Sequence, residues 1–524
     1  MSGAGASQSP VAAMAAIVGD RHILTGEAAL PYATDVYRQI AEPIAVVRPG
    51  DVEELQAVVR AAAAAGLALS VRGGGASYTD AYLPRDEGQI LIDLGRLDRI
   101  VAIEETGGYV TVEAGVTWAA LKQALDARDL RTPFWGPFSG LAATIGGSMS
   151  QNTISHGSGS YGISAQSALA MDVVLADGAL LRTGSAMTGG PPFARHFGPD
   201  LTGIFTGDAG AMGIKARITL PLIRKRPSHR VISFAHPDFA RMHESMRRIA
   251  LERIEDTHFA LDAALSQGQI ARQDRAGSTL AMAMSILRSS PSWRAGARQI
   301  VRAATSARRD IGRAAFMTHY IVEGFNDAEA RARLDRLRTL VQGCGHEIAA
   351  AVPAVVRGMP FAPLFNTLGP AGERWVPLHG ILPHAQASVF HDALEAFYAE
   401  RAEDMRRHGV WTGGMFATVG SSGFLYEIAI YWPDEISAYH RAVIPADYLA
   451  GLPSYPANPE ARAYVHRLKS EMIDLYVRHG AINFQLGKAY PFTSRLAPEP
   501  RALVGAIKAA LDPEARLSPG ALGL

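Results

Sequence analysis

Two glycine-rich stretches, about seventy residues apart, constrain the fold of this chain more than any other feature. The first is VRGGGASYTD at residues 71–80, directly after an apolar run, and the second spans residues 136–162 and holds seven glycines among Ser, Thr and Asn. Glycine weakens helices and strands, so we expect both stretches to be turns whose backbone approaches another group closely. The N–H groups of such turns can converge on phosphate oxygens.

The residues around the first stretch predict two strands and a helix. We expect a strand at 43–50, a helix that begins after Asp51 and stops at Gly66, and a strand that runs from Leu67 into the glycines. Neither glycine stretch is followed by Gly-Lys-Ser/Thr, and neither forms a Gly-x-Gly-x-x-Gly between a strand and a helix. A P-loop nucleotidase and a Rossmann dehydrogenase are therefore both disfavoured.

Length and composition limit the number of domains and the partners. With 524 residues the chain is too long for one ordinary core, and we expect boundaries near 38, 225 and 460. Its 51 basic and 50 acidic side chains nearly cancel, which predicts no nucleic acid and no anionic membrane as a partner. The lone Cys344 excludes an intramolecular disulfide and a cysteine-built metal site. We see no secretory signal and no apolar run long enough to span a membrane, so we expect a cytoplasmic enzyme.

The order of segments in the first half resembles the FAD-binding domain of the vanillyl-alcohol oxidase and para-cresol methylhydroxylase (PCMH-type) flavoproteins. The matching parts, over residues 38–224, are PIAVVRPGDVEELQAVVRAAAAAGLALSVRGGGASY, ILIDLGRLDRIVAIE, VTVEAGVTWAAL, TIGGSMSQNTISHGSGSYG, MDVVLADGALLRTG and DLTGIFTGDAGAMGIKARITLPL. The tail IKAALDPEARLSPGALGL is similar to the family's closing segment, whereas residues 225–410 match more weakly.

This resemblance implies an α+β fold in four parts. Residues 1–37 would form an N-terminal arm, and residues 38–224 a PCMH-type FAD-binding domain of two α+β subdomains. Residues 225–460 would form a substrate-binding cap domain, an antiparallel sheet flanked by helices. Residues 461–524 would return to the FAD domain.

The resemblance also implies a binding site for FAD. The loop from Arg72 to Tyr78 would lie against the pyrophosphate, with the second glycine stretch along the ribityl chain and flavin ring. The implied cofactor-binding residues are Arg72, Gly73, Gly74, Gly75, Ala76, Ser77, Tyr78, Ser139, Thr144, Ile145, Gly146, Gly147, Ser150, Asn152, Tyr161, Ile214 and Lys488. The alternative to cofactor binding is that each residue only stabilises its own turn. For Ser139 or Asn152 taken singly, the two explanations are equally good.

Some relatives bond the flavin covalently through a histidine after this glycine run. Ala76 stands at that place here and has no nucleophile, so we predict noncovalent FAD. His379 and His384 in WVPLHGILPHAQ are a poorer match to a second attachment point. A histidine at a strand end is more often a hydrogen-bonded structural residue.

Two later segments offer catalytic candidates. In GFLYEIAIYW, Glu427 shares one face with Leu425, Ala429 and Tyr431, and Tyr426 lies on the other. A carboxylate in so apolar a strand could act as a base with a raised pKa, although a structural ion pair with an arginine is the alternative. In INFQLGKAYPF, Lys488 could lie near flavin N1 or a substrate carboxylate, or be a solvated surface charge. We therefore take Glu427, Lys488, Tyr426 and His379 as the catalytic candidates.

Residues that depart from the family's pattern limit which of its reactions this chain can be expected to catalyse. Phe484-Gln485 stands where the phenol oxidases use a Tyr-Arg pair, and Ile163 or Ser164 stands where they have an acidic residue. The chain also lacks the GDGN metal motif of the related 2-hydroxy-acid dehydrogenases, so no metal is expected.

We expect an FAD-dependent oxidoreductase that oxidises a C–H next to oxygen in a small alcohol, hydroxy acid or phenolic compound by hydride transfer to flavin N5. Its partners would be a small-molecule substrate and either oxygen or an electron-acceptor protein such as a cytochrome. The sequence is also compatible with a homo-oligomer. The alternative is an FAD-using transferase or lyase without net redox, of the alkylglycerone-phosphate synthase type. A third reading is a catalytically idle binding or assembly protein.

Overall fold

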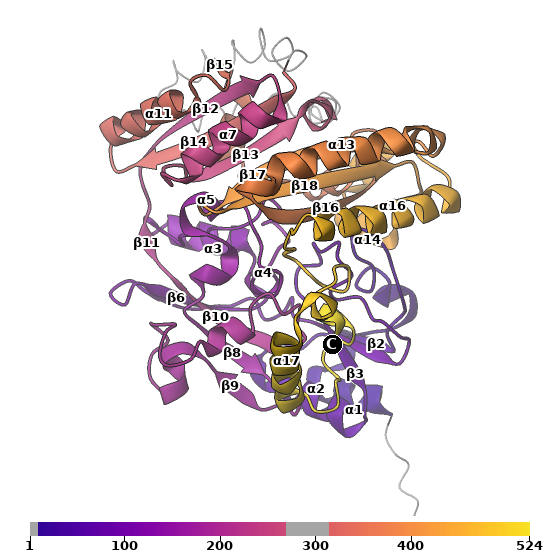
Figure 1. The fold of residues 1–524 in the computed structure, drawn as a ribbon. Helices are drawn as coiled ribbons and strands as arrows, with labels where there is room; N and C mark the ends of the chain where they lie inside the picture. The colour runs from indigo at the N-terminus through magenta and orange to yellow at the C-terminus, as the bar shows by residue number, and fades with distance from the viewer. Residues whose placement is uncertain (1–8, 269–313) are drawn as a thin grey trace, which may run out of the picture.

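Three β-sheets and one two-stranded ribbon organise the chain in the computed structural model, which describes residues 9–268 and 314–524. The four-stranded and five-stranded sheets lie in the first half of the chain, and the seven-stranded sheet lies in the second half, above them in Figure 1. Helices and strands alternate without one regular repeat. This mixture confirms the predicted α+β class.

The first sheet contains the strand that leads into the first glycine loop. Its strands, in spatial order, are β1 (Ile23–Leu24), β2 (Ala45–Val47), β4 (Gln89–Asp93) and β3 (Ala68–Arg72). Both β2 and β3 run parallel to β4. The predicted helix is α2 (Val52–Ala64), and the Asp51 side chain caps it by accepting from the Glu54 N–H at 2.7 Å. Helix α1 (Pro10–Val18) packs beside α2.

The second sheet is antiparallel and carries the second glycine stretch between its strands. Its strands, in spatial order, are β5 (Ile100–Glu104), β6 (Tyr109–Glu113), β10 (Ile214–Pro221), β8 (Ala170–Val174) and β9 (Leu180–Arg182). The helices of this half are α3 (Trp118–Asp126), α4 (Ile145–Gln151), α5 (Ser158–Tyr161) and α6 (Leu201–Ile204). Strands β8 and β9 form a hairpin, because they pair antiparallel across Asp177 and Gly178.

The second glycine stretch is partly helical, although the sequence predicts only a loop. Helix α4 begins after Thr144, whose hydroxyl accepts from the Gly147 N–H at 3.2 Å. It ends at Asn152, whose left-handed backbone (φ 53°) stops the helix. Capping at both ends therefore offsets the weak helix propensity of the two glycines inside it.

The third sheet forms the cap over the first half. Its strands, all antiparallel to their neighbours, are in spatial order β15 (His346–Ile348), β12 (Ser228–His236), β14 (Phe316–Gly324), β13 (Thr257–Asp262), β17 (Trp411–Val419), β18 (Gly423–Trp432) and β16 (Arg374–Pro383). A short ribbon of β7 (Leu130–Arg131) and β11 (Ile223–Arg224) joins it to the first half. No helix among the described residues is long and apolar enough to cross a membrane.

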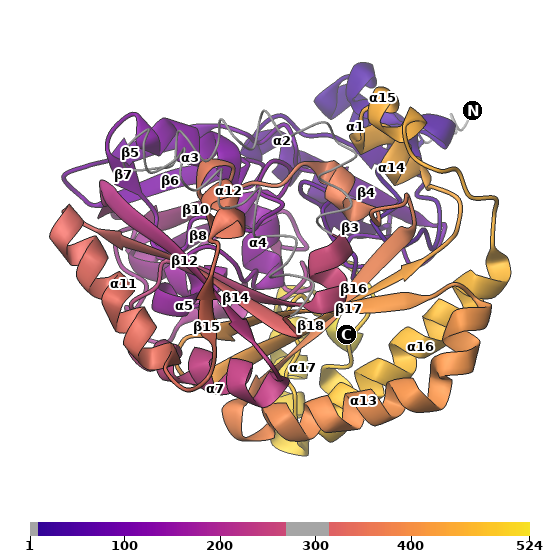
Figure 2. The same cartoon turned by 90° about the horizontal axis from the view of Figure 1, so that it is seen from above.

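Helices cover one face of the cap sheet and leave the other turned toward the first half. The covering helices are α7 (Phe239–Ala250), α11 (Asp327–Val341), α13 (His384–Arg407) and α16 (Pro459–Arg478), which lie along one side of the sheet in Figure 2. Among the described residues, the second half also contains the helices α12 (Ala351–Gly358), α14 (Ala438–Val443), α15 (Ala446–Ala450) and α17 (Pro498–Leu511). In β18, Phe424, Tyr426 and Ile428 pack in the core under the covering helices, so the residues between them face the first half.

After α16 the chain crosses back to the first half. The Gln485 N–H donates to the Gln151 carbonyl at 2.8 Å, and the Lys488 N–H donates to the Thr79 carbonyl at 3.0 Å. Further on, the Leu69 carbonyl accepts from the Ser518 N–H at 2.7 Å, so the tail continues along the edge of the first sheet. The last 40 residues therefore contact both glycine stretches and hold them in place.

A buried ion pair fixes the tail after α17. The Lys508 ammonium lies 2.5 Å from the Asp512 carboxylate and also donates to the Ala211 and Leu517 carbonyls. Both side chains are buried. Removing one partner of such a pair leaves the other charge without compensation.

We expect Asp512→Ala to lower the free energy of unfolding by about 3 kcal/mol, because it leaves the Lys508 ammonium buried and unpaired. The midpoint of urea unfolding measures the change. The matched control is Glu514→Ala, whose carboxylate pairs with Arg516 and is 68% exposed; it should cost less than about 1 kcal/mol. Equal effects of the two substitutions would contradict the role of the buried pair.

Candidate active site

A cavity of about 480 Å³ lies where the glycine stretches meet the open face of the cap sheet. From the first half it is lined by residues 73–78, by residues of the stretch 137–154 and by Ile214 at the start of β10. From the second half it is lined by strands β13, β14, β16, β17 and β18, by α12, and by Phe484 and Gln485. Both glycine stretches and the cap sheet therefore border one space.

The first loop presents a row of backbone donors. Among the described residues, no N–H group of residues 73–78 donates a hydrogen bond to another part of the chain. Native proteins pair almost all of their buried backbone N–H groups, so six successive unpaired donors beside a cavity fit an oxyanion-bearing ligand. This donor set suits a pyrophosphate.

The first loop needs its glycines for close contact with the second loop, in addition to any contact with a ligand. A Cβ added to Gly74 would lie 1.7 Å from the Ala142 carbonyl oxygen, and one added to Gly73 would lie 2.5 Å from the Thr144 hydroxyl. Gly75 has φ +71°, a backbone conformation that side chains disfavour. The two loops therefore touch backbone to backbone, and only glycine allows this approach.

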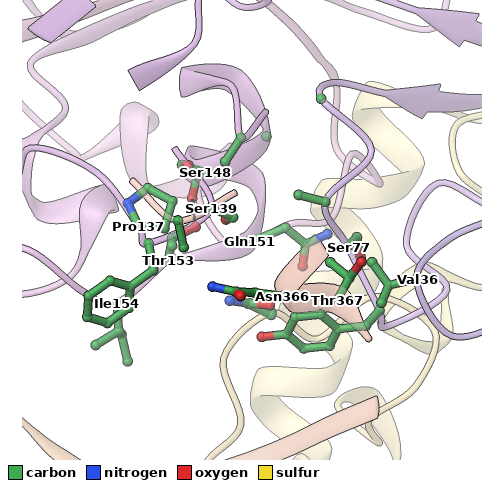
Figure 3. Close-up of a pocket in the computed structure, with 18 of the residues that line it drawn as sticks. Val36, Ser77, Pro137, Ser139, Ser148, Gln151, Thr153, Ile154, Asn366 and Thr367 are labelled. Carbon is green, nitrogen blue, oxygen red and sulfur yellow. Dashed lines mark hydrogen bonds between the residues drawn. The ribbon is translucent and has the colours of Figure 1, made fainter. Parts of the chain in front are cut away.

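The second loop contributes hydroxyl and amide groups to the cavity. Ser139, Ser148 and Thr153 lie on one side and Val36, Ser77 and Thr367 on the other, with Gln151 and Asn366 between them (Figure 3). The Ser150 hydroxyl donates to the Gly146 carbonyl at 3.0 Å, and both residues line the cavity. Such groups suit the hydroxyls of a ribityl chain and the polar edge of a ring system.

Most of the predicted cofactor-binding residues line the cavity. These are Gly73, Gly74, Gly75, Ala76, Ser77, Tyr78, Ser139, Thr144, Gly146, Gly147, Ser150 and Ile214. The others, Arg72, Ile145, Asn152, Tyr161 and Lys488, are not among its lining residues.

The residues outside the cavity have structural contacts of their own. Arg72 is fixed by Asp93 at 2.6 Å, Ile145 is part of the core, and the Tyr161 ring lies against Arg131. The Lys488 ammonium donates to three carbonyls of the segment 80–83, at 2.8–3.2 Å. Burial lowers the pKa of Lys488 to about 8. It therefore joins the C-terminal segment to the residues after the first glycine loop.

Glu427 is the carboxyl group of the cap wall. It lies on β18 and lines the cavity together with Leu425, Ala429 and Tyr431, the face that the alternation predicts. Among the described residues its carboxyl has no hydrogen bond and no ion pair, so the expected alternative of an arginine partner is absent there. Burial in this apolar wall raises the pKa of Glu427 to about 7. A carboxyl with that pKa can accept a proton near neutral pH.

Tyr426 and His379 do not reach the cavity. The Tyr426 hydroxyl lies 2.9 Å from His391 Nδ1, on the covered face of the sheet. His379 stands directly opposite Glu427 in the neighbouring strand, but its buried ring stacks on Phe484 at 3.9 Å between centroids. Burial lowers the pKa of His379 to about 3. Of the four catalytic candidates, only Glu427 borders the cavity.

Several residues of the cavity have no clear signal in the sequence. Gln151 lies in the quoted glycine stretch, and Lys215 follows Ile214, but neither residue type at these positions indicates a site. Lys215 is buried against the Asp208 carboxylate. His319 and α12 come from the segment where the family resemblance is weakest. His319 Nδ1 lies 2.8 Å from the Ser233 hydroxyl, and burial lowers its pKa to about 3.

Comparisons with known proteins agree with this geometry. A family model described as an FAD-binding domain matches residues 43–184. The glycolate oxidase subunit GlcD of Escherichia coli (strain K12) is 30% identical over 212 residues, which is 40% of this chain and 40% of the relative. The match thus spans well under half of that protein.

Solved structures extend the likeness of fold to nearly the whole chain. A p-cresol methylhydroxylase with substrate bound has a TM-score of 0.73 at 19% identity, over 98% of this chain and 96% of that one. An alkyldihydroxyacetonephosphate synthase has a TM-score of 0.66 at 13% identity, over 95% and 82%. At these identities the likeness concerns the fold.

The residues fit the cofactor that the family model names. The unpaired N–H groups of residues 73–78, the hydroxyls of the second loop and the apolar cap wall suit the pyrophosphate, the ribityl chain and the ring of FAD in turn. FAD is therefore the cofactor of this domain. Noncovalent binding stays a prediction from Ala76.

We expect Gly74→Ala to weaken FAD binding at least about tenfold, because the added methyl group collides with the Ala142 carbonyl and separates the two loops. The ratio of flavin to protein absorbance after purification, and titration of the apoprotein with FAD, measure the change. Gly88→Ala is the matched control, since a Cβ at this exposed position meets nothing within 4 Å. A Gly74→Ala protein with full flavin content would refute the loop contact.

Proposed function

We propose that this chain, whose residues 43–184 match a family model described as an FAD-binding domain, is an FAD-dependent oxidoreductase. Its substrate would be a small alcohol, hydroxy acid or phenolic compound that loses two electrons from a C–H bond next to oxygen. The observation that carries the proposal is Glu427, a carboxyl without a partner among the described residues, which borders the same cavity as both glycine loops.

The roles of the residues follow from their surroundings. When bound, FAD supplies the two-electron acceptor. Glu427 accepts the hydroxyl proton of the substrate, for which its raised pKa is suited. Apolar side chains around it, among them Phe259, Met415 and Phe484, exclude water and hold the substrate body. The N–H groups of residues 73–78 fix the cofactor.

The charge of the cavity wall favours an uncharged substrate. Among the described lining residues, Lys215 and Glu427 are the ones with a formal charge, and Lys215 is already paired with Asp208. A hydroxy acid would place its carboxylate near Glu427 without a free cation from these residues, which is costly in a buried space. We therefore prefer a neutral alcohol or phenolic compound.

The same observation bears on the alternative without net redox. A phosphate-bearing substrate needs cationic or donor groups at the substrate end of the cavity, and the described cap wall is mainly apolar. The likeness to alkyldihydroxyacetonephosphate synthase is one of fold alone. The redox proposal has the stronger support. The electron acceptor would be oxygen or a protein such as a cytochrome.

Anaerobic bleaching of the bound flavin tests the proposal. Benzyl alcohol or 4-hydroxybenzyl alcohol should bleach the flavin at least about tenfold faster than mandelate, which carries the same ring and hydroxyl plus a carboxylate. Stopped-flow absorbance near the flavin maximum measures the rates. If a broad panel of alcohols, hydroxy acids and phenols leaves the bound flavin oxidised, the protein is not this oxidoreductase.

Glu427→Gln removes the proposed proton acceptor with little change of shape. We expect kcat to fall by about 10²–10⁴-fold. In the unchanged protein, log kcat/KM should rise with pH up to about 7 and then level, because the base works in its deprotonated form. The variant should lose this rise. Glu347→Gln, which alters an exposed pair with Arg338, serves as control. A pH profile that survives in Glu427→Gln would exclude Glu427 as the base.

A further inference from the structure

A second cavity, of about 350 Å³, lies at the junction between the first half and the cap. We call it the seam pocket. Helix α3, strand β7, the segment 225–229, the end of β14 and the end of α12 line it. Its lining residues are Trp118, Leu121, Lys122, Leu125, Asp126, Leu130, Arg131, Thr132, Trp135, Lys225, Arg226, Pro227, His229, Glu323, Arg357 and Gly358. None of them lines the cavity of the candidate active site.

The seam pocket has an excess of positive charge. Five of its lining side chains are lysines or arginines, and two are carboxylates. The chain as a whole has 51 basic and 50 acidic residues, so this excess is local. A concave surface of one sign concentrates ions of the other.

Each carboxylate of the pocket is already shared by two cations. Asp126 is paired with Lys122 and with Lys225, the latter at 2.7 Å, and these contacts hold the pKa of Asp126 below its usual value despite partial burial. Glu323 lies 2.9 Å from Arg131 and 2.6 Å from Arg357. Neither carboxylate can therefore neutralise the remaining positive charge.

Two arginines retain unused donors. Arg131 is 8% exposed, and although its guanidinium also lies 2.7 Å from Asp256, its Nε has no hydrogen-bond partner among the described residues. Arg226 forms no ion pair with a described residue, and its guanidinium lies 5.5 Å from the centre of the Phe325 ring. Arg226, which is only half-buried, is therefore the cation of the pocket that a ligand can pair with.

We propose that the seam pocket binds a compact, multiply charged oxyanion, of the phosphate or polycarboxylate type. Arg226 and the two lysines around Asp126 supply the charge, and the forked guanidiniums of Arg131 and Arg357 suit oxyanion oxygens. Trp118, Leu121 and Trp135 supply apolar surface to the same lining. The argument for this site does not rest on the proposed oxidation, and its ligand would bridge the first half and the cap.

Binding of inorganic pyrophosphate and of citrate to the FAD-saturated full chain tests the proposal. FAD saturation is needed because pyrophosphate could otherwise enter the cofactor site. Calorimetry at constant ionic strength, with chloride as the comparison anion, should give saturable binding with one site per chain. The two anions distinguish phosphate from polycarboxylate chemistry.

Arg226→Gln should weaken this binding at least about fivefold, and Arg226→Glu more strongly, without changing the flavin spectrum. Arg241→Gln is the matched control, because Arg241 is an exposed arginine of α7 paired with Asp238. Lys122→Gln provides a second variant with the same expected direction. The proposal is overturned if neither anion binds saturably up to about 10 mM, if chloride gives the same effect, or if the Arg226 variants bind as the control does.

Discussion

The backbone contact between the two glycine loops is the constraint on which the site depends. Gly74 leaves no room for a Cβ against the Ala142 carbonyl, and Gly73 leaves none against the Thr144 hydroxyl. Because the loops meet without side chains between them, the N–H groups of residues 73–78 remain unpaired and border the cavity. The glycines therefore act twice, as the packing contact between two loops and as the source of free donors.

The C-terminal segment stabilises the contact between the two glycine loops. It joins residue 485 to the second loop and residue 488 to the segment after the first loop through backbone hydrogen bonds. The Lys488 ammonium then donates hydrogen bonds to three backbone carbonyls of residues 80–83. A lysine that donates to three carbonyls has little rotational freedom. Both sides of the cofactor site are thereby tied to one late piece of the chain, which lies far away in sequence.

The first half and the alternation in β18 could be predicted from the sequence, since both depend on local pattern. Two examples are the Asp51 cap of α2 and the position of Glu427 on the face of β18 that borders the cavity. Lys488 could not be placed, because its partners are carbonyls of a segment some 400 residues earlier. The partly helical second loop was also unexpected, since caps at Thr144 and Asn152 override the weak propensity of its glycines. His319 reaches the cavity only through pairing of distant strands, which no local pattern encodes.

Helix α12 connects the two cavities physically. Val352, Val355 and Val356 line the candidate active site, while Arg357 and Gly358 at the end of the same short helix line the seam pocket. A second contact runs through Trp135, which lines the seam pocket and stacks on His156 at 4.3 Å, and His156 in turn contacts Phe138 of the active-site wall. Close-packed elements transmit displacement, so an anion bound at Arg357 would contact the same helix whose apolar face bounds the substrate space.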